Sequence, residues 1–249
     1  MKPFLILQLR PETKASDSEF AAFLEKGNLS PDQTRRIRLD RNPDLSAINL
    51  DDYSGVIVGG GPGCVSDPPH LKPENEKAIE DAVMGLMPAI TTRDFPFLGC
   101  CYGIGILAYF LDGKVSKENF SEPVGAVTCS LTDQGKSDPL LKGLPDSFRA
   151  FVGHKEAVQA LPPDTVHLVA SAPCPFQMIR HKSNVYATQF HPEADPDGFE
   201  LRIRIYKDRG YFPPEDALRL IEQVRSENVC HPETLLKNFI TRYRSDRAT

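Results

Sequence analysis

Apolar strand segments that alternate with helical segments most strongly constrain how the first part of this chain can fold. The expected strands are 4–9, 35–40, 53–63 and 95–100, and the expected helices are 18–27, 73–87 and 104–111. FLILQL, VIVGGG and FPFLG are apolar without alternation, which is typical of strands buried on both faces. Such strands occur in parallel sheets that helices cover on both sides. The sequence therefore predicts an α/β fold.

The second half of the chain has a different pattern, with short strand-like segments followed by helical ones. The expected strands are 125–132, 148–154, 166–173, 176–181 and 185–190, and the expected helices are 199–209, 214–227 and 232–245. We find no internal repeat and no low-complexity linker. We therefore predict a domain over residues 1–198 and a helical extension over 199–249 that packs on the same domain.

Composition excludes several classes of protein. The chain has 249 residues, 40% of them hydrophobic, and a net charge of −5, which argues against a nucleic-acid partner. The apolar run before Arg10 is too short for a signal peptide or a membrane span, so we expect a cytoplasmic protein with no membrane attachment. Its 6 cysteines are then expected to be thiols, and no Cys-x-x-Cys pair indicates a metal site.

Adjacent cysteines stand where the apolar strand FPFLG meets a helix. Cys101 has glycines two positions away on each side, Gly99 and Gly103, which suits a nucleophile on a strained strand-to-helix turn. The start of the helix would favour the thiolate of Cys101. Cys100 lacks this flanking and is expected to point into the core. The alternative is that both cysteines are buried structural residues.

A cysteine nucleophile needs a base and a group that orients the base. His-Pro-Glu occurs twice, and only His191 follows an apolar strand, VYATQF, at the edge where open α/β sheets build their sites. His231 precedes a helical segment, so its tripeptide is interpreted as a helix start. Glu193 is the candidate that orients His191, and the alternative is a solvated loop glutamate.

The glycine-rich turn VIVGGGPG can supply backbone N–H groups to a negatively charged oxygen. Gly61 would donate one N–H group and Tyr102, which follows the nucleophile, the other. The turn lacks the lysine and hydroxyl residues of a phosphate-binding loop. We therefore predict an oxyanion hole here.

Together these segments resemble the class I (triad) glutamine amidotransferase family. The resemblance rests on 59–63, 99–103 and 190–193, supported by LDGKV (111–115) and GHKEAV (153–158), and it covers about residues 3–195. It is closest to the amidotransferase domain of GMP synthase and its stand-alone relatives. It implies a flavodoxin-like three-layer sandwich with a mostly parallel central sheet, followed here by the helical appendage.

The resemblance also implies a reaction. Cys101 would attack the side-chain amide of glutamine and form a γ-glutamyl thioester, with His191 as the base and Glu193 orienting it. Gly61 and Tyr102 would hold the oxyanion. No metal and no organic cofactor are expected.

The substrate pocket implied by the resemblance contains Gly60, Gly105, Gly153 and His154. At the turn this chain reads Gly-Ile-Gly (103–105) where the family usually has Gly-His-Gln, and that glutamine normally helps to bind the substrate. No synthetase segment with an ATP-binding signature follows, so ammonia would pass to a separate synthetase subunit or be released.

These departures leave three hypotheses. The first is an amidotransferase that hydrolyses glutamine and passes ammonia to a partner protein. The second is a hydrolase that uses the same thioester chemistry on a γ-glutamyl peptide or amide. The third is a catalytically silent binding or regulatory module, against which stands the complete Cys-His-Glu set.

Overall fold

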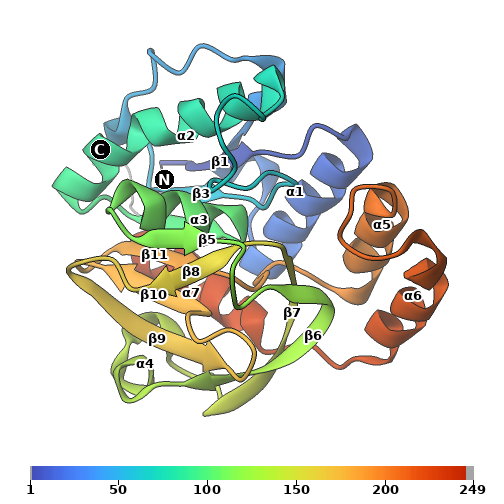
Figure 1. The fold of residues 1–249 in the computed structure, drawn as a ribbon. Coiled ribbons are helices and arrows are strands. Elements are labelled where there is room, and N and C mark those ends of the chain that lie inside the picture. Colours follow the sequence, from blue (N-terminus) through green and yellow to red (C-terminus); the bar gives the residue numbers. More distant parts are fainter. Residues whose placement is uncertain (1, 245–249) are drawn as a thin grey trace.

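The computed structural model describes residues 2–244, and its centre is a nine-stranded sheet (Figure 1). Its strands are β1 (Phe4–Gln8), β2 (Thr34–Arg38), β3 (Gly55–Val58), β4 (Phe97–Cys100), β6 (Glu122–Leu131), β7 (Ser147–His154), β9 (Thr165–Ser171), β10 (Met178–His181) and β11 (Val185–Thr188). The order across the sheet is β2-β1-β3-β4-β11-β10-β9-β6-β7. Strands β2, β1, β3, β4 and β11 are parallel, whereas β10, β9, β6 and β7 are antiparallel to their neighbours.

Helices cover both faces of this sheet. They are α1 (Thr13–Gly27), α2 (Glu74–Arg93), α3 (Tyr102–Phe110), α4 (Asp133–Ser137), α5 (Pro196–Tyr206), α6 (Ala217–Ser226) and α7 (Pro232–Tyr243). Along β1, Leu5 and Leu7 belong to the core under α2 and α3, whereas Phe4 and Ile6 belong to the core under α1 and α7. Every residue of β1 is buried, and all of them except Gln8 are apolar, as is typical of a strand covered on both faces. The predicted three-layer, flavodoxin-like α/β fold is confirmed.

The structure also differs from the sequence prediction in local detail. Helix α2 continues through Pro88 to Arg93, beyond the predicted end at 87, because Ile90 packs into the same core as Val83 and Met87. A small antiparallel pair, β5 (Lys114–Ser116) with β8 (Ala157–Ala160), was not predicted, because β5 is short and only partly buried. The last residue of the predicted helix 232–245 lies outside the described residues.

The C-terminal helices take part in the main cores. Helix α7 packs against α1 and β7, and its Phe239 is fully buried with its ring centroid 6.1 Å from that of Phe4. Helices α5 and α6, orange to red in Figure 1, lie together at one side of the molecule, where Val224 of α6 and Phe151 of β7 belong to one core cluster. None of the helices within residues 2–244 is both long and apolar enough to span a bilayer.

Truncating Phe239 tests whether α7 belongs to the main core. We expect Phe239→Ala to lower the free energy of unfolding by about 3–5 kcal/mol, because it removes a fully buried ring and leaves a cavity. Urea unfolding followed by circular dichroism would measure this. The control is Leu218→Ala in α6, where the side chain is 68% exposed and the expected change is within about 0.5 kcal/mol. A Phe239→Ala protein as stable as the wild type would contradict the assignment.

Candidate active site

Neighbouring parallel strands bring the predicted nucleophile and base to one edge of the sheet. Cys101 follows β4 directly, and His191 lies three residues beyond the end of β11. The strands are paired with Thr188 opposite Cys100, and the N–H of Cys101 donates to the carbonyl of Thr188 at 2.7 Å. Parallel strands end at the same edge, so both side chains reach one pocket, whose lining includes Cys101 and His191.

The turn at Cys101 is strained in the way the sequence predicts. Cys101 has φ 54° and ψ −91°, a conformation that side-chain-bearing residues rarely adopt. A Cβ on Gly99 would lie 2.9 Å from the carbonyl carbon of Gly103, so the backbone of the next helix needs a glycine there. Cys100 is fully buried in the core beneath α1 and α7, as expected.

Neighbouring side chains lie so close to the glycine-rich turn after β3 that Gly59 and Gly60 have no room for a Cβ atom. A Cβ on Gly59 would lie 2.3 Å from a carboxylate oxygen of Glu19. A Cβ on Gly60 would lie 2.7 Å from Arg10 Nη2 and 2.7 Å from His191 Cε1. The N–H of Gly60 donates to Glu19 Oε1 at 3.2 Å. Glycines are therefore needed for close approach of charged side chains and the imidazole.

The imidazole of His191 is held in one orientation. Its Nδ1 is 2.9 Å from Glu193 Oε1, and its backbone N–H donates to the carbonyl of Phe151 at 3.0 Å. Burial lowers the pKa of His191 despite the neighbouring carboxylate, which favours the neutral ring. With the Nδ1 proton directed at Glu193, Nε2 carries the lone pair that a general base needs.

Glu193 is fully buried and ionised. Burial alone would raise the pKa of this carboxyl group, but His191 and Arg202 outweigh it and hold the pKa well below its usual value. The interpretation of Glu193 as a solvated loop residue is therefore wrong, because none of its side chain reaches solvent.

The expected thiolate of Cys101 is also wrong for the free protein. Burial raises the pKa of the Cys101 thiol to about 12, and Glu193 acts in the same direction, whereas Arg10 opposes it. Loss of solvation outweighs the start of the short helix α3. The thiol of Cys101 and the imidazole of His191 are therefore both neutral in the free protein. The side-chain amide of Gln189 lies 4.0 Å from Sγ.

Two adjoining pockets meet at Cys101, and both are also lined by Gly61 and Gly153. The first contains His191 and the second contains the predicted residues Tyr102, Gly105 and His154. Gly60, also predicted, packs directly beneath the imidazole. The predicted residues thus lie together at the strand ends.

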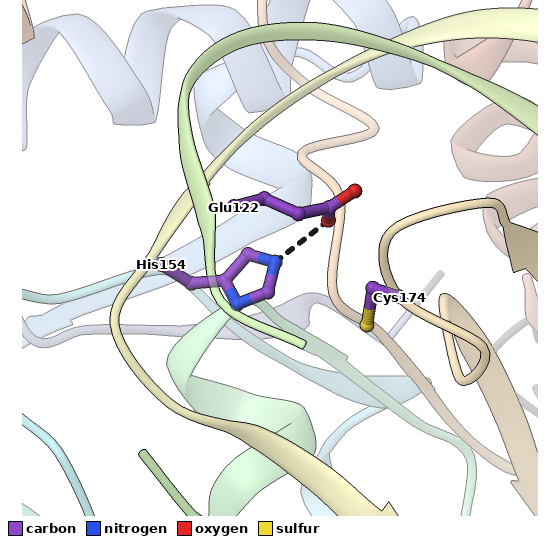
Figure 2. A group of neighbouring side chains, drawn as sticks. All are labelled: Glu122, His154 and Cys174. Atoms are coloured by element: carbon purple, nitrogen blue, oxygen red, sulfur yellow. Dashed lines mark hydrogen bonds and ion pairs between the residues drawn. The ribbon is translucent and has the colours of Figure 1, made fainter. Parts of the chain in front are cut away.

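His154 makes contacts that favour a structural task for its side chain. Its Nε2 is 2.7 Å from Glu122 Oε2 (Figure 2). Its Nδ1 is 2.8 Å from the carbonyl oxygen of Glu156. Both ring nitrogens are therefore engaged within the protein. These contacts hold the segment that carries Glu156, whose carboxylate accepts the N–H groups of Val65 and Ser66 beside the second pocket.

Cys174 lies near this pair, and ligand atoms of Glu122, His154 and Cys174 are within 4.8 Å of one another (Figure 2). Zinc accepts these ligand types. However, the carboxylate of Glu122 already accepts hydrogen bonds from Ser171 at 3.0 Å and Gln177 at 2.5 Å in addition to His154. We therefore describe the cluster as a buried hydrogen-bonding network and assign no metal to it.

Sequence reasoning missed the charged residues that contact Glu193 and the glycine-rich turn. Arg10 Nε donates to Glu19 Oε1 at 2.8 Å, and Arg202 Nη2 donates to Glu193 Oε1 at 2.9 Å. Arg10 directly follows the expected apolar strand 4–9, at the sheet edge where sites form, and this position could have indicated it. Glu19 and Arg202 lie in ordinary helical segments, and no motif marks them. The lining of the first pocket also includes Tyr206 and Tyr211 from the predicted extension.

Comparison with known proteins agrees with this geometry. The family described as Glutamine amidotransferase class-I matches residues 33–203. One of the subunits of the glutamine-hydrolysing GMP synthase of Pyrococcus abyssi is 30% identical over 152 residues, 61% of this chain and 70% of that protein. The glutamine-hydrolysing GMP synthase of Thermomicrobium roseum is 31% identical over 187 residues, 74% of this chain but only 32% of that longer protein.

Solved structures show the same fold. A glutamine amidotransferase from Thermotoga maritima has a TM-score of 0.75 at 21% identity, covering 98% of each chain. A glutamine amido transferase from Methylobacillus flagellatus has a TM-score of 0.67 at 20% identity, covering 97% of this chain and 95% of that one. At this coverage both alignments include the C-terminal helices.

The raised pKa of Cys101 predicts how the free protein reacts with alkylating reagents. Iodoacetamide should modify Cys101 slowly at neutral pH, and the rate should rise about tenfold for each pH unit as the thiolate fraction grows toward a pKa of about 12. Mass spectrometry of peptides from a Cys230→Ser protein would measure this, because Cys230 is exposed and would otherwise react as well. A pH-independent, fast modification of Cys101 would contradict the neutral thiol.

Proposed function

The chain belongs to the class I glutamine amidotransferase family, and we propose that it hydrolyses the side-chain amide of glutamine through a thioester on Cys101. One observation carries the proposal. Cys101 stands on a strained turn in the same pocket as a buried imidazole, His191, whose Nδ1 is 2.9 Å from the carboxylate of Glu193. This arrangement supplies a nucleophile, a base and a group that orients the base.

In the first half of the reaction, Sγ of Cys101 attacks the amide carbon while Nε2 of His191 removes the thiol proton. The carbonyl oxygen becomes negatively charged and accepts hydrogen bonds from the N–H groups of Gly61 and Tyr102. Tyr102 is the first residue of α3, so its N–H has no partner carbonyl within that helix. His191 then protonates the departing nitrogen, the C–N bond breaks and the thioester remains.

In the second half, water attacks the thioester. His191 removes a proton from the water, the C–S bond breaks and the proton returns to the sulfur, which releases glutamate. Glu193 stays ionised throughout and stabilises the imidazolium that forms in each half.

The ammonia formed in this reaction needs a destination. The relative from Pyrococcus abyssi is named as one of the subunits of a glutamine-hydrolysing GMP synthase. We infer that ammonia from this chain passes to a separate synthetase subunit. Copurification of a synthetase with the tagged protein would support this assignment.

Glutamate release by the purified protein tests the proposal. Cys101→Ala should lower the rate by at least about 10³-fold, because it removes the nucleophile. Cys100→Ala is the matched control, because it removes a neighbouring sulfur that is buried in the core. Its rate of glutamate release should keep the wild-type order of magnitude. Release that survives Cys101→Ala would contradict the proposal. Ligand binding by a wild-type protein that releases nothing from any γ-glutamyl compound would instead favour the silent module.

A second candidate function is hydrolysis of γ-glutamyl peptides. His191 protonates the leaving group, so the leaving group must lie in the pocket that contains His191. The apolar and aromatic lining of that pocket consists of Val124, Phe199, Ile203, Tyr206, Tyr211 and Phe212. Ammonia needs no such lining, whereas the amino-acid side chain of a peptide leaving group would bury apolar surface there.

A substrate panel separates the two candidates. If the pocket binds a leaving amino acid, kcat/KM for a γ-glutamyl dipeptide with an aromatic second residue should exceed that for glutamine. Phe212→Ala should lower the ratio of kcat/KM for the dipeptide to kcat/KM for glutamine by about tenfold. The substitution removes an apolar contact with the leaving amino acid and none with the γ-glutamyl group. Leu218→Ala, on the exposed face of α6, is the control. Faster turnover of glutamine than of every dipeptide would exclude the peptide function.

A further inference from the structure

The carboxylate of Glu193 has a second partner besides the imidazole. Arg202, on α5, donates Nη2 to Glu193 Oε1 at 2.9 Å, the same oxygen that is 2.9 Å from His191 Nδ1. The Arg202 side chain is only 9% exposed and Glu193 is fully buried. A charge-assisted hydrogen bond of this kind is strong and directional in a buried site.

The same guanidinium faces another buried carboxylate. Arg202 Nη2 lies 4.0 Å from Glu19 Oε1, which accepts hydrogen bonds from Arg10 Nε at 2.8 Å and from the N–H of Gly60 at 3.2 Å. A continuous series of contacts therefore runs from the imidazole through Glu193, Arg202 and Glu19 to the glycine turn. It joins the base to the turn that carries the predicted oxyanion donor.

Little else holds this carboxylate. Glu193 Oε2, Arg202 Nε and Arg202 Nη1 are buried without a hydrogen-bond partner among the described residues. The two side chains are thus joined by one hydrogen bond, from one N–H group to one carboxylate oxygen, and not by the two parallel hydrogen bonds of a bidentate pair. Removing the guanidinium would leave a buried negative charge whose side-chain partner is His191 alone.

We propose that Arg202 is a positioning residue, which fixes the Glu193 carboxylate toward His191 and, through Glu19, ties this pair to the turn at Gly60. The proposal rests on the proposed function, in which His191 is the base. Arg202 touches neither substrate nor the reacting atoms in this assignment. It acts through the residues it binds.

The arrangement has an electrostatic consequence for His191. The charged and titratable groups that face it are Glu193 on its own loop, Arg202 on α5, Arg10 after β1 and Cys101 on the turn after β4, with Glu19 of α1 behind the arginines. Burial is the main cause that lowers the pKa of His191, and Arg202 lowers it further whereas Glu193 raises it. Loss of the Arg202 charge should therefore raise this pKa, and loss of the Glu19 charge should lower it.

Variants of Arg202 and Glu19 test the proposal with two readouts. The first is NMR titration of the His191 ring in a Cys101→Ala background, which needs no activity. The second is the pH profile of glutamate release. Arg202→Met should raise the titration midpoint, move the acidic limb of the rate profile to higher pH and lower kcat about 10- to 100-fold. In Arg202→Lys the titration midpoint of His191 should be closer to the wild-type value, because lysine keeps the positive charge.

Glu19→Gln should shift the midpoint in the opposite direction from Arg202→Met. General structural damage would not produce opposite signs. Arg204→Met is the matched control: Arg204 lies on the same helix, is exposed and pairs with Glu200. It should match the wild type in both readouts, and thermal melting would confirm that each variant is folded.

An unchanged His191 midpoint in folded Arg202→Met protein, or an equal shift in Arg204→Met, would overturn the proposal. If Arg202→Met does not fold, Glu19→Gln still decides the proposal through a midpoint below the wild-type value, and Arg202→Lys through a midpoint near the wild-type value. If wild-type protein releases no glutamate, the proposed function fails, but the NMR titration continues to test Arg202 separately.

Discussion

The hydrogen bond from the N–H of Cys101 to the carbonyl of Thr188, 2.7 Å long, is the contact on which the site depends. It joins the ends of neighbouring parallel strands, so the strained turn and the loop that carries His191 cannot move apart. A strained backbone of this kind persists only when surrounding structure holds it in place. Here that structure is the fully buried strands β4 and β11 and the close approach of Gly99 to Gly103.

A second constraint is the cost of buried charge. Glu19 and Glu193 are fully buried, and Arg10 and Arg202 compensate them at distances of 2.8 Å and 2.9 Å. Removing one partner of such a buried ion pair destabilises a protein more than replacing both partners with apolar residues, because the remaining charge stays desolvated. The network therefore needs α1, the segment after β1 and α5 together, so α5 is part of the candidate site.

The same burial determines the protonation states of Cys101 and His191 in the free protein. It raises the pKa of the Cys101 thiol and lowers that of His191, so both are neutral before substrate arrives. A neutral pair avoids a reactive thiolate in the free protein. In the proposed reaction, proton transfer is then coupled to attack on the amide, where the proposed oxyanion hole would stabilise the charge that develops.

The sequence by itself determined the α/β fold, the turn at Cys101 and the choice of His191 over His231, because each depends on periodicity or on neighbours within a few positions. Only the tertiary structure decided the protonation state of Cys101 and the partners of Glu193, since burial and long-range contacts set them. Glu19 and Gly60, for example, are 41 positions apart, and no local pattern records their contact. Local propensity is encoded along the chain, whereas desolvation and charge pairing arise only when the segments are packed together.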